Sequence, residues 1–333
     1  MRLCIALFML ACIGSGATGN ETLRQKTLEL IRGSDMAKYL NAPVKVFAGT
    51  GGTTGVSDEG IYIFQYTLER PAESSEPNVV IEPEFALPDG ADMAVFVTHG
   101  WIEGAEKDWP ASMAAAIAER TDPNQWVCGY FDWSGGSRVI TSIHAAQYAR
   151  DIGGGRLAAA ILRLSDKWKH IHLIGHSAGA WVIESAGRKL LEKMPDCTIH
   201  LTFLDAYVPS EWQADQLGQA AGGGKGWAEH YYTRDITLKV TEHNLANAHN
   251  ADLTAVDPLI AEHKFPYRWY LATITGAYER WDEKKETVYK KSGQVEYGFG
   301  RSLEAGQTNW RESLLLKAGN KAVRIKVSHL ILI

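Results

Sequence analysis

The stretch 172–181 contains a glycine-x-serine-x-glycine frame, in which Gly175 and Gly179 flank Ser177. An apolar run precedes the frame and an alanine-rich stretch follows it, so the serine lies between an expected strand and an expected helix. Such a tight turn needs glycine where a side chain would collide, and it presents the serine hydroxyl at the carboxyl end of a sheet. The pattern predicts that Ser177 is a nucleophile. The alternative is a purely structural turn between a strand and a helix.

A serine hydroxyl is a poor nucleophile unless a base takes its proton, and the base needs an acid to orient it. In strand–turn–helix sites of this kind, the acid follows the serine along the chain and the histidine comes last. Asp205 ends the apolar run 201–205 and would lie near Ser177 if that run is the next core strand. We therefore expect Asp205 to be the acid, the alternative being an aspartate that caps a turn.

Four later histidines are candidates for the base. His230 lies inside an expected strand, which favours a structural role, whereas His243 and His249 lie in a polar loop at a separation that matches no usual metal-ligand spacing. His263 lies in a loop just before an expected helix. The residues alone leave this choice open, with the loop position favouring His263.

The developing negative charge on a reacting carbonyl needs backbone donors. One is expected from the residue after the nucleophile, which is Ala178. The other is expected from the loop that begins Thr98-His99-Gly100-Trp101, where the N–H of Trp101 is the candidate. His99 itself is expected to be structural rather than a proton carrier.

These residues require a sheet that brings distant segments together. Apolar runs that end in glycine or a polar residue predict strands, and apolar residues at a spacing of three and four predict helices. Strand–helix alternation predicts a parallel sheet with helices on both faces, an α/β fold. The expected strands are 61–69, 78–85, 94–100, 126–133, 171–177, 198–206 and 228–240, the expected helices are 109–120, 157–168, 179–193 and 266–281, and 218–227 is an expected flexible loop.

With these residues assembled, the chain resembles the pancreatic-type lipase family of α/β hydrolases over residues 61–275. The resemblance rests on VFVTHGWIEG, GYFDWSGGS, IHLIGHSAGAW, FLDAYVP and HKFPYRWYL, taken in order along the chain. It implies an α/β-hydrolase fold, with a triad of Ser177, Asp205 and His263 and an oxyanion hole built from the N–H groups of Trp101 and Ala178. His263 is thereby preferred over the other histidines.

The chain departs from the family pattern near the nucleophile. Ala178 replaces the usual leucine, Trp181 stands where the family often has histidine, and Ala206 replaces a proline. The segment 208–262 has no cysteine that could close a lid. The fold implied by the resemblance also places Cys128 and Cys197 on strands that are not neighbours, so both are expected to be free, buried thiols.

The remaining composition limits the class of protein. The chain has 333 residues and a net charge of −5 without a basic stripe, which argues against nucleic-acid binding. Residues 1–19 resemble an export signal, because the apolar run after Arg2 is shorter than the roughly 20 residues that span a bilayer. A second reading is a lipoprotein signal that would place lipid on Cys12. We divide the rest into an N-terminal extension (20–60), a catalytic domain (61–281) and a C-terminal extension (282–333).

The predicted function is an exported serine carboxylic ester hydrolase, a lipase or esterase that acts on lipid esters through an acyl-enzyme. It would need no metal or organic cofactor, and contact with a membrane or lipid interface is an open expectation. The alternatives are an acyltransferase or another acyl hydrolase on the same triad, and a non-catalytic binding relative. Aromatic residues at 212, 227, 231, 232, 267 and 269 are candidates either for an acyl site or for core packing.

Overall fold

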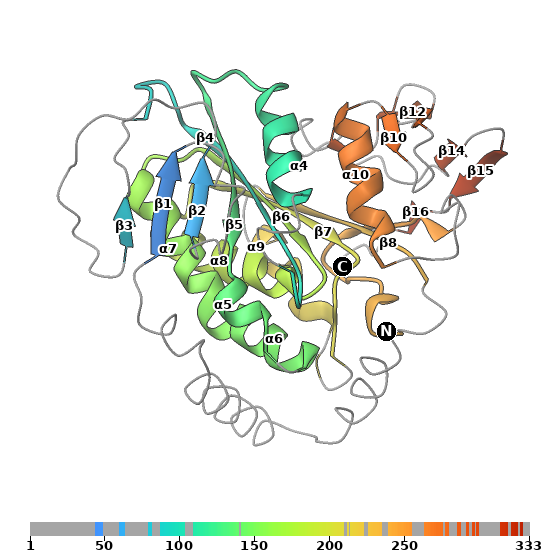
Figure 1. Cartoon of the computed structure of the whole chain (residues 1–333), viewed down its shortest axis with the longest axis horizontal. Helices are drawn as coiled ribbons and strands as arrows, with labels where there is room; N and C mark the ends of the chain where they lie inside the picture. Colours follow the sequence, from blue (N-terminus) through green and yellow to red (C-terminus); the bar gives the residue numbers. More distant parts are fainter. Residues whose placement is uncertain are drawn as a thin grey trace.

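The computed structural model describes the central part of the chain and shorter segments on either side of it (Figure 1). The described residues are 44–48, 60–63, 79–81, 87–103, 109–139, 141–209, 212, 214–222, 226–234, 239–254, 263–275, 277–279, 285–287, 291–292, 295–296, 298–299, 314–318, 321–325 and 327–328. The expected export signal and Cys12 lie outside these ranges.

A ten-stranded sheet forms the centre of the molecule, in the order β16-β9-β8-β7-β6-β4-β5-β2-β1-β3. The six neighbouring strands from β9 to β5 are all parallel, while β2 and β16 join the two sides of this block in antiparallel fashion. The strands are β1 (Val44–Ala48), β2 (Gly60–Ile63), β3 (Val79–Ile81), β4 (Met93–Thr98), β5 (Trp126–Asp132), β6 (His170–His176), β7 (Thr198–Leu204), β8 (Trp227–Tyr232), β9 (His249–Asp252) and β16 (Val327–Ser328). The pairs β10 (Ala277–Glu279) with β11 (Lys285–Thr287), β12 (Lys291–Ser292) with β13 (Val295–Glu296) and β14 (Leu314–Ala318) with β15 (Lys321–Ile325) are separate and antiparallel.

The central strands are buried on both faces because helices cover the sheet on both sides. In β4, β6 and β7 every residue after the first is buried. Apolar side chains therefore meet across the strands, as where Val97 lies in register with Ile174. A parallel block between two helical layers is the α/β-hydrolase fold that the sequence predicts.

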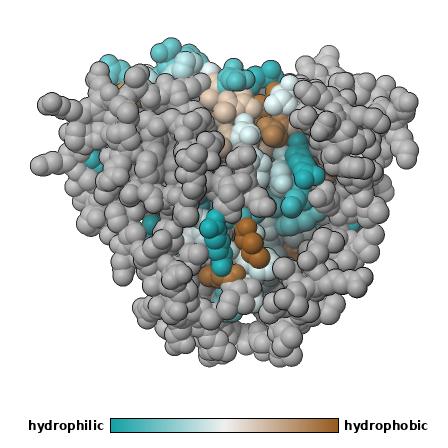
Figure 2. All heavy atoms as spheres, viewed as in Figure 1, coloured by the Kyte–Doolittle hydropathy of each residue, from teal (hydrophilic) through white to brown (hydrophobic). Residues whose placement is uncertain are grey.

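The helices divide between the two faces of the sheet (Figure 1). On one face α8 packs against β6 and β7, with α7 beside it; on the other face α4 packs against β4 and β5 and contacts α10. The helical segments are α4 (Trp109–Ala118), α5 (Ser134–Ser137), α6 (Ser142–Tyr148), η2 (Ala149–Gly153), α7 (Gly154–Leu164), α8 (Gly179–Lys193), η3 (Ala214–Gln216), α9 (Gln219–Gly222), η4 (Lys239–Thr241) and α10 (Phe265–Thr275). Figure 2 shows a pale apolar surface where α4 lies, in keeping with its half-buried alanines.

Several expectations about elements were wrong. The expected helix 266–281 ends at Thr275 in α10, because the next residues form β10 and pair with β11. The expected strand 228–240 ends at Tyr232, because the N–H of Thr233 turns away to donate to Asp205 Oδ1 (2.8 Å). Within the expected flexible loop 218–227, α9 forms and its buried alanines pack against α8.

Segments outside the expected catalytic domain also belong to the central sheet. β1 and β3 pair with each other, β1 also pairs with β2, and β16 pairs with β9. The sheet thus draws strands from the N-terminal and C-terminal extensions. Among the described residues, no helix is both long enough and apolar enough to cross a membrane.

The two cysteines of the described region confirm the sequence prediction. Cys128 lies on β5 and Cys197 directly precedes β7, and β4 and β6 run between these two strands. Both thiols are free and buried. Burial raises the pKa of Cys128 to about 11 and that of Cys197 to about 12, so neither thiol is activated as a nucleophile.

Candidate active site

Ser177 occupies a sharp turn between β6 and α8. Its φ of 53° lies in the left-handed region, which is unusual for a residue that has a side chain. The flanking glycines permit this turn: a Cβ on Gly175 would lie 2.6 Å from the carbonyl oxygen of Gly179, and a Cβ on Gly179 would lie 2.4 Å from that of His99. Steric requirements of the backbone therefore fix the glycine positions, and the serine side chain is left 7% exposed.

A second strained turn follows the neighbouring strand β7. Asp205 has a φ of 50°, and the backbone on either side of it is bonded to the serine turn. The N–H of Ser177 donates to the carbonyl of Leu204 (3.0 Å), and the N–H of Tyr207 donates to the carbonyl of Ser177 (3.1 Å). These two hydrogen bonds hold the serine and aspartate turns side by side at the carboxyl end of the sheet.

Both carboxylate oxygens of Asp205 accept a hydrogen bond. It is fully buried, and its Oδ1 accepts the N–H of Thr233 (2.8 Å). Its Oδ2 faces Nδ1 of His263 at 2.5 Å, and the imidazole is 26% exposed. Since a carboxylate only accepts, Nδ1 carries the proton, which leaves Nε2 of His263 as a proton acceptor.

His230 supports the turn that carries Asp205. Its Nε2 accepts the N–H of Ala206 (3.2 Å), and its Nδ1 donates to Oδ1 of Asn250 (3.2 Å). Burial lowers its pKa to about 4, so the ring is neutral and suited to accept that bond. The structural role expected for His230 is thus supported by its contacts.

The other two histidine candidates lie away from this arrangement. His243 is exposed, beyond the short helix η4. His249 was expected in a loop, but it begins strand β9 and pairs with Glu229 in parallel register. Of the four candidates, His263 is the one whose ring contacts the Asp205 carboxylate.

The loop after β4 lies directly against the serine turn. A Cβ on Gly100 would lie 2.8 Å from Cβ of Ser177, so this backbone passes as close to Ser177 as packing allows. The first residue of α8, Gly179, makes the equivalent close approach to His99 from the other side. The N–H groups of Trp101 and Ala178 therefore belong to two segments in contact, as an oxyanion hole requires.

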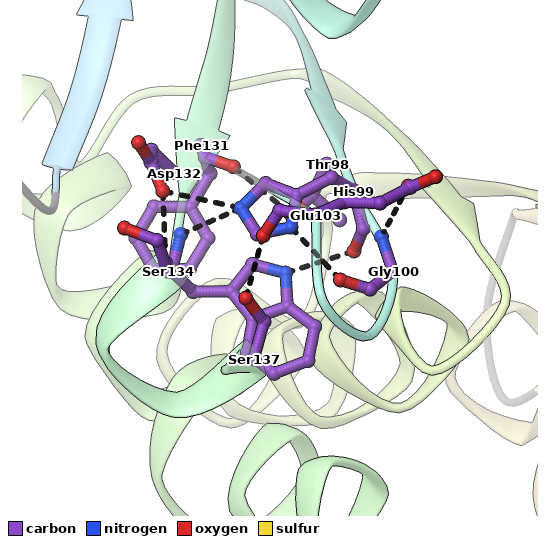
Figure 3. A network of polar contacts seen from close by, with 9 residues as sticks. Thr98, His99, Gly100, Glu103, Phe131, Asp132, Ser134 and Ser137 are labelled. Carbon is purple, nitrogen blue, oxygen red and sulfur yellow. Dashed lines mark hydrogen bonds and ion pairs between the residues drawn. The ribbon is translucent and has the colours of Figure 1, made fainter. Parts of the chain in front are cut away.

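A polar network holds this loop in place (Figure 3). The carbonyl of His99 accepts the indole N–H of Trp133 (2.8 Å), and the His99 ring stacks on that indole and contacts Asp132 (3.2 Å). Burial opposes the charge on His99, but Asp132 outweighs it and the pKa is raised. His99 thus ties the loop to the end of β5, in agreement with the structural role expected for it.

Ile102 stands out on the same loop. It has a φ of 56° and is 49% exposed, and among the described residues it is the large apolar side chain that is most open to solvent. Its N–H donates to the carbonyl of Ser137 (3.0 Å) and the indole of Trp101 donates to the carbonyl of Val139 (2.8 Å). The loop backbone is therefore fixed while one apolar side chain points outward beside the site.

A separate buried cluster contains groups that can bind metal ions. His172, His200 and Glu229 have donor atoms within 4.8 Å of one another. However, the two imidazole rings are stacked with centroids 3.7 Å apart and planes 7° apart, so no single point lies in both ring planes. Instead, His172 Nε2 bonds the hydroxyl of Thr202 (2.8 Å). That hydroxyl donates to Glu229 Oε1 (2.8 Å), which also faces Nε2 of His200 (3.1 Å). This arrangement fits a core hydrogen-bond network better than a metal centre.

Most of the aromatic residues considered for an acyl site pack in the core. Tyr231, Tyr232, Tyr267 and Trp269 are each buried, and Tyr231 contacts the ring of Trp269. The indole at position 212 is different: it lies edge-on to Trp181, with the guanidinium of Arg150 4.1 Å from its centroid.

The sequence reasoning missed two residues at the site. His176 directly precedes Ser177, and its Nε2 lies 3.0 Å from the carbonyl oxygen of His263. Its Nδ1 lies 3.3 Å from a carboxylate oxygen of Glu103, 73 residues earlier in the chain. The available signal was its position inside the serine frame, but no spacing in the sequence pairs it with Glu103.

Comparison with known proteins finds relatives for part of this chain. A family model described as Lipase matches residues 73–215. A pancreatic lipase-related protein 2 of Myocastor coypus is 38% identical over 99 residues, covering 28% of this chain and 20% of the relative. The protein of the same name from Rattus norvegicus is 29% identical over 163 residues, covering 46% and 32%. An inactive pancreatic lipase-related protein 1 of Mus musculus is 30% identical over 133 residues, covering 37% and 26%. The chain thus spans about a third or less of the length of these relatives.

Proposed function

Because residues 73–215 belong to the lipase family of the pancreatic type, we propose that this chain is a serine carboxylic ester hydrolase that acts on lipid esters. The observation that carries the proposal is the hydrogen bond of 2.5 Å between His263 and Asp205, at the sheet edge where the strained Ser177 turn lies. Structural roles alone do not require a buried carboxylate, an oriented imidazole and a strained serine at one edge.

In the proposed reaction, Ser177 Oγ attacks the ester carbonyl while Nε2 of His263 takes its proton. The buried Asp205 carboxylate holds Nδ1–H and stabilises the imidazolium that forms. The imidazolium then gives its proton to the leaving alcohol, and an acyl-serine remains. Water, activated by the same histidine, releases the acid and regenerates Ser177.

The tetrahedral intermediates carry a negative charge on the former carbonyl oxygen. The N–H groups of Ala178 and Trp101 are the proposed donors to it. Their segments pack against each other and are held by the His99 network, so the donors are oriented before the substrate binds. Fixed donors of this kind lower the barrier because no reorganisation is needed during the reaction.

The direct test is hydrolysis of p-nitrophenyl esters from acetate to palmitate by the wild-type chain and by Ser177→Ala. We expect hydrolysis by the wild type, and a fall in kcat of about 10⁴-fold or more for Ser177→Ala, because the nucleophile is lost. Ser142→Ala, which changes a buried serine on α6, is the matched control. A wild type without activity on the whole series, or a Ser177→Ala variant at the wild-type rate, would reject the proposal.

The name of one relative favours a second candidate, a non-catalytic member of the same family. Labelling with a fluorophosphonate probe separates the two, since it reports an activated serine whatever the substrate. Labelling that is lost in Ser177→Ala supports the enzyme, and a wild type that resists the probe supports the non-catalytic candidate. An acyltransferase on the same triad would be recognised by ester products when an alcohol acceptor is supplied.

Export of the chain is part of the proposal. The N-terminal residues read as an export signal, and the relatives it matches are pancreatic lipases. Labelling with palmitate that disappears in Cys12→Ala would indicate the lipid-anchored form instead of simple export.

A further inference from the structure

His176 is a buried histidine next to the nucleophile that the proposed reaction does not use. It is the last residue of β6 and is 1% exposed. Its Nε2 lies 3.0 Å from the backbone carbonyl oxygen of His263 and its Nδ1 lies 3.3 Å from Oε2 of Glu103. The carbonyl oxygen only accepts, so Nε2 donates to His263.

Glu103 makes two further hydrogen bonds that hold it in place. The same Oε2 accepts the N–H of Gly100 (3.1 Å), and its backbone carbonyl accepts the hydroxyl of Ser137 (2.6 Å), as Figure 3 shows. Burial alone would raise the pKa of this carboxyl, but His176 and the Gly100 N–H together hold it well below its ordinary value. The carboxylate is therefore charged, buried and paired.

Aromatic side chains on two helices confine the His176 ring. Trp109 of α4 and Tyr267 of α10 both contact it edge-on, at centroid distances of 5.8 and 4.9 Å, and these two rings stack on each other at 4.3 Å. The His263 ring lies 4.6 Å from the His176 ring on a further side. The imidazole of His176 is thus surrounded and has one orientation available to it.

These contacts connect three separate segments of the site. Gly100 belongs to the proposed oxyanion-hole loop, His176 to the serine turn, and His263 to the turn before α10. We infer that Glu103 and His176 form a positioning pair that holds the oxyanion-hole loop and the catalytic histidine in register with Ser177. The inference rests on the proposed function, since it assigns roles within the same site. Neither side chain touches the reacting atoms.

Two amide substitutions at position 176 test this inference. In His176→Gln the amide nitrogen reaches the place of Nε2 and still donates to His263, whereas in His176→Asn the amide reaches only the place of Nδ1 and the bond from residue 176 to the carbonyl of His263 is lost. We expect kcat on p-nitrophenyl butyrate to fall about 10²-fold in His176→Asn, as for a small misplacement of a catalytic group, and by about tenfold or less in His176→Gln. KM should stay near the wild-type value in both.

A double-mutant cycle tests the partnership with Glu103. Glu103→Gln keeps an acceptor for Gly100 but removes the charge that faces His176, so kcat should fall. Combined with His176→Asn, it should cost little beyond the worse single variant, because paired residues act as a unit. His172→Gln, on the same strand and also buried, is the control for replacing a core histidine: it should lower Tm but not kcat per folded molecule.

The outcomes distinguish a failure of the proposed function from a failure of the positioning pair. A wild type that hydrolyses no ester removes the proposed function itself. An active wild type with His176→Asn at the wild-type kcat overturns the positioning pair. The pair is also overturned if the two amide variants lose activity equally and in proportion to their Tm, since a merely structural role would behave in that way.

Discussion

At the scale of single residues, the turn at Asp205 is the most informative part of the site. Asp205 combines a left-handed backbone, complete burial and two acceptor contacts. Strain of this kind persists where surrounding contacts over-determine it. Here the flanking Leu204 and Tyr207 are bonded to the backbone of Ser177, and the N–H of Asp205 donates to the carbonyl of Tyr231 (2.8 Å). The carboxylate also accepts the N–H of Thr233. The carboxylate is therefore placed by the fold rather than by its own preference.

Replacement of this carboxylate tests its role. In Asp205→Asn the amide oxygen can still accept the N–H of Thr233, but the neutral side chain no longer stabilises the imidazolium of His263. We expect kcat on p-nitrophenyl butyrate to fall about 10⁴-fold with little change in KM. The exposed Asp215→Asn is the control and should keep the wild-type rate. A small effect for Asp205→Asn would show that another group orients His263.

At the scale of elements, the site depends on how closely α8 approaches the loop after β4. A Cβ on Gly179 would lie 2.4 Å from the backbone carbonyl oxygen of His99, and backbone cannot move aside cheaply. A Cβ on Gly155 of α7 would instead meet the end of the flexible Lys189 side chain at 2.6 Å. The two contact distances are similar. However, a Cβ on Gly179 would have to displace backbone, whereas a Cβ on Gly155 would displace only a flexible side chain.

This contrast gives a prediction for helix packing. Gly179→Ala should destabilise the protein by about 1–3 kcal/mol and abolish most esterase activity, because it pushes α8 away from the oxyanion-hole loop. Gly155→Ala should be neutral or slightly stabilising, since alanine favours the helix by about 1 kcal/mol over glycine. Urea unfolding and initial rates measure both. Equal stability for the two variants would mean that the close approach is not required.

At the scale of the whole molecule, the sheet buries an unusual set of histidines. Burial lowers the pKa of His170 and of His230 to about 4, and it lowers those of His172 and His200 well below the ordinary value. In the folded state these four rings therefore stay neutral in mild acid. In the unfolded chain the same rings take up protons near pH 6.5. The pKa of His99 is raised instead. Four histidines therefore make the fold less stable in mild acid, and one has the opposite effect.

The consequence is loss of stability in mild acid. The histidine contribution is complete above pH 6.5 and is lost as pH falls from 6.5 towards 4, at up to about 1.4 kcal/mol per pH unit for each histidine. Urea unfolding at pH 7.5, 6.0 and 5.0 should show the free energy of unfolding falling over this range. His170→Phe should reduce the slope of the unfolding free energy against pH by the amount that about one proton contributes. The exposed His243→Gln should leave this slope unchanged. A pH-independent stability would contradict this account.

Local signals explain what could be predicted from the sequence. The apolar strand, the two glycines around Ser177 and the start of α8 are all encoded within residues 170–193, and the predicted helix 179–193 coincides with α8. Asp205 was predicted because it ends a recognisable apolar strand, whereas the choice of His263 among the histidines rested on the resemblance to the lipase family. Where an element ended through a distant partner, as β8 ends where the N–H of Thr233 donates to Asp205, the prediction failed.

The sequence by itself determined the parallel sheet, the strained serine turn and the short set of residues from which a triad could be drawn. The tertiary structure decided which histidine meets Asp205, across 58 positions, and paired His176 with Glu103, across 73. It also recruited β1 and β16 into the sheet. The physical reason is that backbone sterics and apolar periodicity act between neighbours in the chain. Side-chain hydrogen bonds between distant segments have no local pattern until the fold brings them together.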